Sequence, residues 1–531
     1  MANRFLAKLR MPDGTINPWV IAVTVTLATF MEVLDTSIAN VALPHIGGSL
    51  SASPDESTWV LTSYLVSNAV VLPLSGWLSS ILGRKRFYMG CVALFTVSSF
   101  LCGLAPSLGV LVVCRILQGA GGGGLQPSEQ AILNDTFPLS QRGMAFAVYG
   151  LAVVVAPTIG PALGGWITDN ISWRWIFYIN VPVGIISLVL THFIVSDPPH
   201  LKRARAKLKD GFRIDYIGIG LITLGLGSMQ IILDKGQRED WLASGFIRVF
   251  FVLMLVGVIS GIIWELREKE PVVDLRMLKD RNFAIATLAM FFLGFVLYSS
   301  TVLIPQLLQQ LLGYTAGLAG QALSPGGAVI MCMMPVVGIL VSRVDARYLI
   351  TFGCIVSASA LFVMAGWDLN LDFGHAVRAR MLQSFGLAFL FIPINVAAFA
   401  YVPKEKTNMG TGIINLARNI GASVGIATVT ALLQSRAQFH QAKLMEHVNK
   451  MNPAFISMTN GTAMKLVSRG SSLSQAATQA QGMVYGLVQR QATMLAFLDN
   501  FKILGIVFFA VIPILLLMKK PRVPAGGVPV H

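Results

Sequence analysis

The chain has 531 residues, of which 54% are hydrophobic and only 12% are charged. Soluble globular domains carry about 25% charged residues, so the composition excludes a soluble protein and indicates a surface that mostly faces lipid. The net charge of +15 would by itself be compatible with nucleic-acid binding. The positions of the basic residues favour a membrane topology instead, so no nucleic-acid partner is expected.

Apolar runs of about 20 residues mark transmembrane helices, and the chain contains fourteen such runs. We therefore predict an all-α membrane protein whose termini lie on one side. The predicted spans are 19–43, 58–81, 87–105, 108–131, 144–168, 176–195, 215–233, 246–265, 283–304, 317–341, 348–366, 379–401, 411–433 and 495–518.

Basic residues gather on one side of the predicted membrane. With the N-terminus in the cytoplasm, most lysines and arginines fall in cytoplasmic connections. The short outer loops then hold few basic residues, namely Arg174, Lys235, Arg238, Arg378 and Arg380. Because positive residues prefer the cytoplasmic side, we predict a multi-pass protein of the bacterial inner membrane with both termini cytoplasmic.

The first six and the last six spans resemble each other weakly. Arg115 and Gln118 in the fourth span match Arg380 and Gln383 in the twelfth. Carriers are often built from duplicated bundles that move around a central site, and spans seven and eight have no counterpart. The predicted units are a six-helix bundle (1–195), a basic linker (196–214), two inserted helices (215–265), a linker (266–282), a second six-helix bundle (283–518) and a tail (519–531).

The first span contains two acidic residues, Glu32 and Asp35, which are three apart and share a helix face. Charges inside a membrane helix are costly and are functional by default. At about 1.5 Å per residue, Asp35 and Arg115 of the fourth span reach similar depths, so we predict that they interact. Gln118 and Gly119 lie on the same face as Arg115.

The second bundle keeps the arginine but has no acid near Val296, the position that matches Asp35. We therefore favour a proton-coupling role, in which Asp35 takes up a proton when Arg115 moves away. A fixed ion pair between the two spans is the alternative. Glu32 is interpreted either as a second titrating or cation-attracting group, or as a residue solvated in the cavity. The energy source is then a proton gradient, and no cofactor is expected.

The fifth span carries a stripe of small residues with two prolines, including Gly160, Pro161, Gly164 and Gly165. Such stripes permit close helix contact, and the prolines bend the helix. Tight packing alone would explain the pattern. A sharper interpretation is a bendable contact between the two bundles that seals the cavity.

Several polar residues are candidates for the substrate cavity. Gln306 and Gln309 fit the outer mouth of the cavity or a polar helix end, and Arg418 with Asn415 fits the cavity or a cytoplasmic cap. The full candidate set is Asn40, Gln118, Gln306, Gln309, Asn415 and Arg418.

The outer connection at 434–492 is long, polar and rich in Gln, Ser and Met. Its part at 440–449 has a helical pattern. Two interpretations remain open, a disordered surface loop and a docking surface for a periplasmic partner.

Motifs in several spans together resemble one family. The chain resembles the EmrB-type permeases, in the fourteen-helix drug/proton antiporter branch of the major facilitator superfamily. The motifs are 34–44 in the first span, Arg115 with Gln118-Gly119, Gly160-Pro161 with Gly164-Gly165, 173–182, and Gly313-Tyr314-Thr315-Ala316 with Pro325-Gly326-Gly327.

The resemblance implies the major facilitator fold, with two six-helix bundles plus two inserted helices. It implies multidrug efflux of small amphipathic compounds, proton coupling through Asp35 and Arg115, an EmrA-type periplasmic adaptor and an outer-membrane channel. Of the family's loop between spans two and three, this chain keeps Gly76, Gly83, Arg84 and Lys85. Ser80 and Ile81 replace the family's charged pair, which argues against a charge-based latch on that loop.

Other functions fit the sequence less well. The seven histidines are scattered and form no catalytic constellation, so an enzyme is not expected, and no channel filter repeat is seen. Within transport, a dedicated exporter of a lipid, siderophore or other metabolite remains an alternative to multidrug export. A docked assembly subunit with little transport of its own is another alternative.

Overall fold

The chain folds into a bundle of long helices, as a computed structural model describes it for residues 16–196, 215–403, 406–449 and 451–519. Most of the predicted linker 196–214 and of the predicted tail 519–531 lies outside these residues. Within them, thirteen helices are long and apolar enough to cross a membrane. The remaining predicted span, 144–168, lies within the helix Leu139–Asn170, so every predicted span corresponds to a helix or to a pair of consecutive helices.

The N-terminal bundle contains the first six spans, two of which are each divided into two helices. In α6 and α7 the break falls at two glycines, Gly123 and Gly124, and α9 and α10 are separated at Ile179. The helices are α2 (Pro18–Ser49), α3 (Pro54–Ser57), α4 (Trp59–Leu82), α5 (Arg84–Leu104), α6 (Leu108–Gly122), α7 (Leu125–Thr136), α8 (Leu139–Asn170), α9 (Trp175–Tyr178) and α10 (Asn180–Ile194).

The C-terminal bundle and the inserted pair follow. The inserted helices pack on each other, and the first of them also contacts α4 of one bundle and α18 of the other. The elements are α12 (Tyr216–Lys235), η1 (Trp241–Ala243), α13 (Gly245–Arg267), η2 (Leu275–Lys279), α14 (Arg281–Gln310), α15 (Ala316–Leu340), α16 (Ala346–Met364), α17 (Phe373–Ala398), α18 (Thr407–Met445), α19 (Pro453–Val467) and α20 (Leu473–Leu516).

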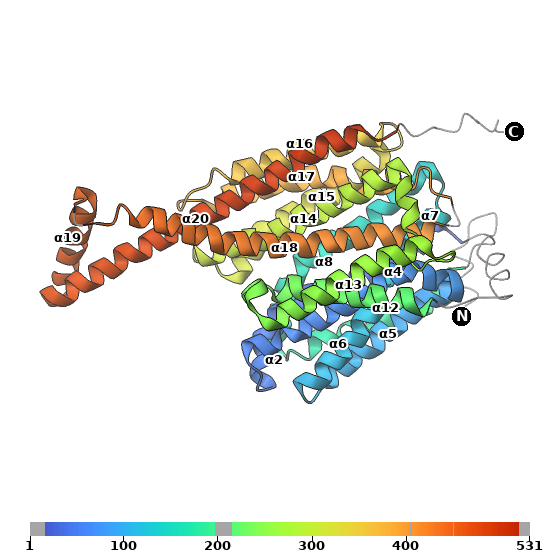
Figure 1. Cartoon of the computed structure of the whole chain (residues 1–531), viewed down its shortest axis with the longest axis horizontal. Helices are drawn as coiled ribbons and strands as arrows, with labels where there is room; N and C mark the ends of the chain where they lie inside the picture. The colour runs from blue at the N-terminus through green and yellow to red at the C-terminus, as the bar shows by residue number, and fades with distance from the viewer. Residues whose placement is uncertain (1–15, 197–214, 404–405, 450, 520–531) are drawn as a thin grey trace.

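The helices lie side by side along the long axis of the molecule, so that the bundle has two ends (Figure 1). We call the end where α2 begins and α20 ends the terminal end. The opposite end, from which α19 projects, is the hairpin end. The two bundles meet through α8 against α15 and through α4 against α18.

The described residues of the long connection at 434–492 are mostly helical, so the interpretation as a disordered loop is wrong. It consists of the end of α18, all of α19 and the start of α20. The predicted helix at 440–449 is present as far as Met445. At 1.5 Å per residue, the 44 residues of α20 span about 66 Å. A membrane core is only about 30 Å thick, so α20 is much longer than a membrane span requires, and Figure 1 shows it extending beyond the rest of the bundle.

Candidate functional site

A cavity of about 330 Å³ lies between the two bundles, lined by residues of α2, α4, α7, α8, α12, α14 and α18. Residues of α2 from Glu32 to Asn40 form one wall, and residues of α18 from Asn419 to Ile426 form the opposite wall. The charged, polar and tyrosine side chains in the lining are Glu32, Thr36, Ser37, Asn40, Tyr64, Asn68, Gln126, Gln230, Asp234, Tyr298, Thr301, Asn419 and Ser423.

Backbone contacts between the bundles close this cavity at the terminal end. A Cβ added to Gly76 of α4 would lie 2.7 Å from the carbonyl oxygen of Asn408 on α18. A Cβ on Gly143 of α8 would lie 2.5 Å from the carbonyl oxygen of Gly338 on α15. Both glycines therefore allow an approach that no other residue would permit. The lining residues lie between this seal and the hairpin end, so the cavity faces the hairpin end.

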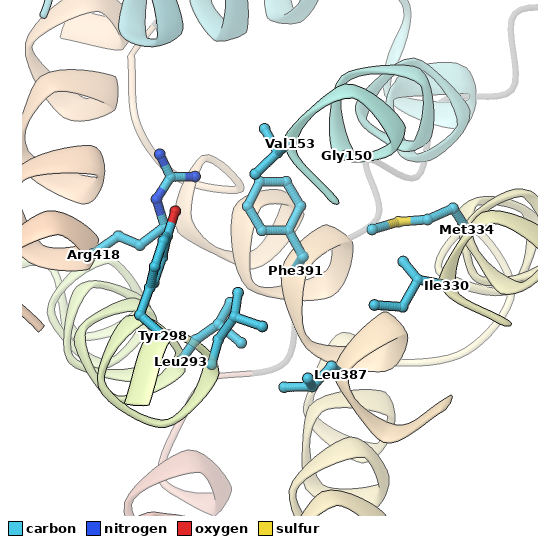
Figure 2. A pocket seen from close by; sticks show the side chains of 10 residues that line it. Gly150, Val153, Leu293, Tyr298, Ile330, Met334, Leu387, Phe391 and Arg418 are labelled. Atoms are coloured by element: carbon cyan, nitrogen blue, oxygen red, sulfur yellow. The ribbon is translucent and has the colours of Figure 1, made fainter. Parts of the chain in front are cut away.

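A smaller, apolar pocket lies next to the cavity between α8, α14, α15 and α17. Figure 2 shows Phe391, Met334, Ile330 and Leu387 around it, with Arg418 and Tyr298 at one edge. Its volume of about 30 Å³ leaves room for about two water molecules. The space between the bundles is therefore nearly filled at this position.

The predicted contact between Asp35 and Arg115 is present. The Arg115 Nη1 lies 2.6 Å from the Asp35 Oδ2, and neither side chain is more than 2% exposed. The other carboxylate oxygen, Oδ1, accepts hydrogen bonds from the amides of Gln118 at 2.9 Å and Asn180 at 2.7 Å. A buried charge pair is tolerated when further hydrogen bonds satisfy both partners, and these three donors do so for Asp35.

The Asp35–Arg115 pair lies inside the N-terminal bundle and does not line the cavity. Tyr64 separates the two, because it lines the cavity and its ring lies 4.3 Å from the Arg115 guanidinium carbon. The Arg115 Nε also donates to the Val60 carbonyl oxygen at 2.9 Å. A movement of Tyr64 would therefore connect the cavity to the ion pair.

Glu32 faces the cavity directly. Its Oε1 accepts hydrogen bonds from the Tyr64 hydroxyl at 3.1 Å and from the Asn68 amide at 3.4 Å. Its Oε2 accepts one from the Gln126 amide at 2.7 Å. The side-chain carbonyl of Gln126 accepts in turn from the Arg418 guanidinium of the other bundle. Glu32 thus belongs to a chain of hydrogen bonds that crosses the interface.

The matching position in the second bundle has no acid, as the sequence predicted. The Arg380 Nη1 donates to the Gln383 Oε1 at 2.7 Å, which repeats the Arg115–Gln118 bond at 2.7 Å. Its other partners are the hydroxyls of Ser300 and Thr301, both at 3.5 Å. The charge is therefore compensated in only one of the two bundles.

The candidate cavity residues divide into four groups. Asn40 lines the cavity, whereas Gln118 is buried with Asp35. Asn415 and Arg418 lie between the bundles, where Asn415 donates to Gln130 at 2.9 Å. Gln306 and Gln309 are not among the lining residues, and Gln309 is exposed near the end of α14, so the structure favours the polar helix end over the mouth of this cavity.

The glycine stripe of α8 packs within its own bundle. A Cβ on Gly160 would lie 2.4 Å from the Ser37 Oγ of α2, and one on Gly164 would lie 2.8 Å from Ile38. The expected contact between the bundles at this stripe is therefore wrong for this conformation, and Gly143 makes that contact instead. Gly165 has a looser contact, 3.9 Å from Val41.

Pro161 explains one hydrogen bond of α2. Proline has no N–H, so the carbonyl of Pro157, four residues earlier, lacks its helical donor. The Ser37 Oγ donates to that carbonyl oxygen at 3.2 Å. The missing N–H of Pro161 therefore allows a hydrogen bond between α2 and α8 beside the cavity.

The remaining motif residues position helices of the N-terminal bundle. A Cβ on Gly119 would lie 2.4 Å from the Tyr64 carbonyl oxygen, so α6 and α4 touch there. Gly83 precedes α5 with φ of 89°, a conformation that favours glycine. Arg84 forms a buried ion pair with Asp135 of α7 at 2.5 Å, so its charge is paired within its own bundle.

Three of the basic residues assigned to outer loops lie in helices, and two of these are buried. Arg378 is an exposed residue near the start of α17. Arg380 is a buried residue of α17, and Lys235 is the buried last residue of α12, where it donates to the Thr58 hydroxyl. Their charges are therefore not solvated loop charges.

The sequence interpretation missed several polar partners. Gln126 and Tyr64 are recognisable only from their hydrogen bonds, since single amides and tyrosines are common in membrane helices. Asn180 lies in the motif 173–182, but the motif did not indicate its contact with Asp35. Glu129 of α7 is different, because it is an acid within the predicted span 108–131 and is fully buried. The rule that singled out Glu32 would also have found it.

Comparisons with known proteins agree with this architecture. The sequence profile described as Major Facilitator Superfamily matches residues 25–426. The chain is 34% identical over 509 residues to "Multidrug export protein EmrB" of Escherichia coli (strain K12), covering 96% of each protein. It is 36% identical over 516 residues to "Fatty acid resistance protein FarB" of Neisseria gonorrhoeae, covering 97% of this chain and 98% of that protein.

A solved structure shares the fold. The human organic anion transporter MFSD10 (TETRAN) aligns with a TM-score of 0.58 at 14% identity, covering 94% of this chain and all of that chain. At this identity the likeness concerns the arrangement of the helices alone.

Proposed function

Because the chain belongs to the major facilitator superfamily and is a multidrug efflux permease of the EmrB type, we propose that it exports small amphipathic compounds in exchange for protons. The observation that carries the proposal is the buried Asp35–Arg115 pair beside a cavity that closes at the terminal end. An acid whose only cation partner is on another helix can exchange that partner for a proton when the helices move. The proton gradient is the energy source, and no cofactor takes part.

The orientation that we propose places the terminal end in the cytoplasm of a bacterial cell, in the inner membrane. The bias of basic residues toward that end supports it. The conformation described here then faces the periplasm. Protons that enter from the periplasm reach Glu32 before Asp35, because Glu32 lines the cavity and Asp35 does not.

Two states of Asp35 would produce the exchange. When Asp35 is ionised it holds Arg115, Gln118 and Asn180, so α2, α6 and α10 are joined through one carboxylate. Protonation removes the charge that binds Arg115 and so weakens this junction. Substrate binding and proton binding then favour different arrangements of the bundles, which is the requirement for coupled exchange.

The lining favours amphipathic compounds without a net negative charge. Tyr64 and Tyr298 offer aromatic surfaces, and Glu32 and Asp234 are both acidic. No lysine or arginine is among the lining residues of the described part of the chain. An anionic substrate would meet two carboxylates and no cation in the lining itself. The main alternative is a dedicated exporter of a lipid, siderophore or other metabolite, which FarB's name, fatty acid resistance protein, favours by similarity.

The partners that we propose are membrane lipids, an EmrA-type periplasmic adaptor and an outer-membrane channel, as in a tripartite pump. The helical projection of α18, α19 and α20 beyond the bundle supports an adaptor. Met451, Met464 and Leu473 on this projection are 91%, 75% and 80% exposed. Large apolar side chains that are exposed to water can mark a protein interaction site.

A panel of compounds on the purified protein in liposomes tests the function. Cationic, neutral and anionic amphiphiles of similar size are offered under an imposed pH gradient. We expect gradient-dependent accumulation of the cationic and neutral members, and weaker transport of the anionic ones. Uphill transport that does not depend on the pH gradient would contradict the proposal, and exclusive transport of fatty acids would favour the alternative.

A further inference from the structure

Glu129 of α7 is a buried acid that the mechanism above does not use. Its side chain is fully buried between the helices of the N-terminal bundle. The Thr26 hydroxyl of α2 donates to its Oε1 at 2.6 Å, whereas its Oε2 has no hydrogen-bond partner. The hydroxyl oxygen of Thr29, one turn along α2, also has none.

No cation compensates Glu129 within the described part of the chain, where the ion pairs involve other acids. The titratable groups that face it are Glu32 of α2, Tyr88 of α5 and Tyr149 of α8. Both tyrosine hydroxyls already donate elsewhere, to Val25 at 2.8 Å and to Gln126 at 3.0 Å. An ionised carboxylate is poorly supported in such a place, so these surroundings favour the neutral acid.

Glu129 lies at the inner end of a row of polar side chains that starts in the cavity and runs between α2 and α7. Thr26, Thr29 and Glu32 are each three residues apart and share one face of α2. Gln126 and Glu129 are three apart on α7, which runs in the opposite direction. The upper contact is Glu32 with Gln126 at the cavity, and the lower contact is Thr26 with Glu129, nearer the terminal end. The unpartnered Thr29 hydroxyl belongs to the turn between them.

We propose that Glu129 is a second proton-binding site, which carries a proton between Glu32 and the terminal end during the transport cycle. The inference rests on the proposed proton exchange. In the transfer, the O–H bond of protonated Glu32 breaks and its proton goes to the Thr29 oxygen. The Thr29 hydroxyl proton goes to ionised Glu129, so Glu32 ends as a carboxylate and Glu129 as an acid. When the glycine contacts at the terminal end separate, Glu129 releases this proton to water on that side.

Two variants in liposomes test the proposal, with substrate accumulation and proton movement measured together. Glu129→Gln keeps the size and can still accept from Thr26, but it cannot bind a proton. We expect gradient-driven accumulation to fall about tenfold or more, while exchange of substrate across the membrane without a gradient is retained. Glu265→Gln is the matched control, since Glu265 is a buried acid of α13 remote from the cavity lining. It should behave like the wild type.

Infrared spectroscopy gives a readout that does not depend on transport. The wild type should show the C=O stretch of a buried protonated carboxyl group, and Glu129→Gln should lose it. Thr26→Val, which keeps the acid and removes its hydroxyl donor, should shift the frequency of that band. Two results would overturn the role of Glu129 but not the proposed function. One is an unchanged band in both variants, and the other is a proton-to-substrate ratio in Glu129→Gln equal to that of the wild type. Proton-independent transport by the wild type would overturn the proposed function instead.

Discussion

Arg418 of α18 donates a hydrogen bond to the side chain of Gln126 on α7, across the interface between the two bundles. The same Gln126 donates to Glu32, which faces the cavity. The charge on Glu32 is therefore linked by one amide to a contact that must break when the bundles move. These three side chains therefore connect the cavity, the protonation of Glu32 and the movement of the two bundles.

The variant Gln126→Leu should break this link. It removes a donor from Glu32 and an acceptor from Arg418, and unpaired buried polar groups are costly. We expect a loss of stability of about 2 kcal/mol, seen as a lower melting temperature in detergent, together with slower transport. Gln309→Leu is the control, because Gln309 is exposed and lies outside the cavity lining. An unchanged melting temperature in Gln126→Leu would contradict the role given to this amide.

The seal at the terminal end should not tolerate a side chain at Gly143. A Cβ there would lie 2.5 Å from the Gly338 carbonyl oxygen, so Gly143→Val should disfavour the conformation described here. We expect a cysteine introduced at Asn415 to become more reactive toward a water-soluble maleimide added at the terminal end. Gly109→Val serves as the control, because a Cβ at Gly109 meets nothing within 4 Å. Equal labelling in both variants would show that the glycine contact is not the seal.

The helical projection can be shortened without touching the cavity. Replacing α19 and its flanking loops by a short flexible linker leaves the cavity-lining residues unchanged. We expect normal proton-driven transport by this variant in liposomes and loss of drug resistance in cells that depend on the adaptor. If transport in liposomes were lost as well, the projection would be part of the transport machinery rather than a docking surface.

Much of this architecture follows from patterns within single helices. The fourteen spans were predictable because each is a long apolar run, and the Asp35–Arg115 contact followed from the depth of two residues in antiparallel helices. The helical projection was not predictable, because a polar Gln- and Ser-rich stretch fits both a loop and a helix that extends into water. The helix that packs against the Gly160 stripe could not be predicted either. The same pattern of small residues would fit a contact with α2 or a contact with the other bundle.

In the proposed mechanism, Asp35 gains and loses a proton during transport. The direct test compares the wild type with Asp35→Asn, with the pH gradient as the only energy source. For each protein, the number of protons released per substrate bound or transported is measured. Asparagine keeps the size of the side chain but cannot titrate, and its NH2 group replaces one of the two acceptor oxygens. We therefore expect gradient-driven transport to fall about a hundredfold, while exchange without a gradient persists. Full gradient-driven transport by Asp35→Asn, with the wild-type proton ratio, would contradict this account.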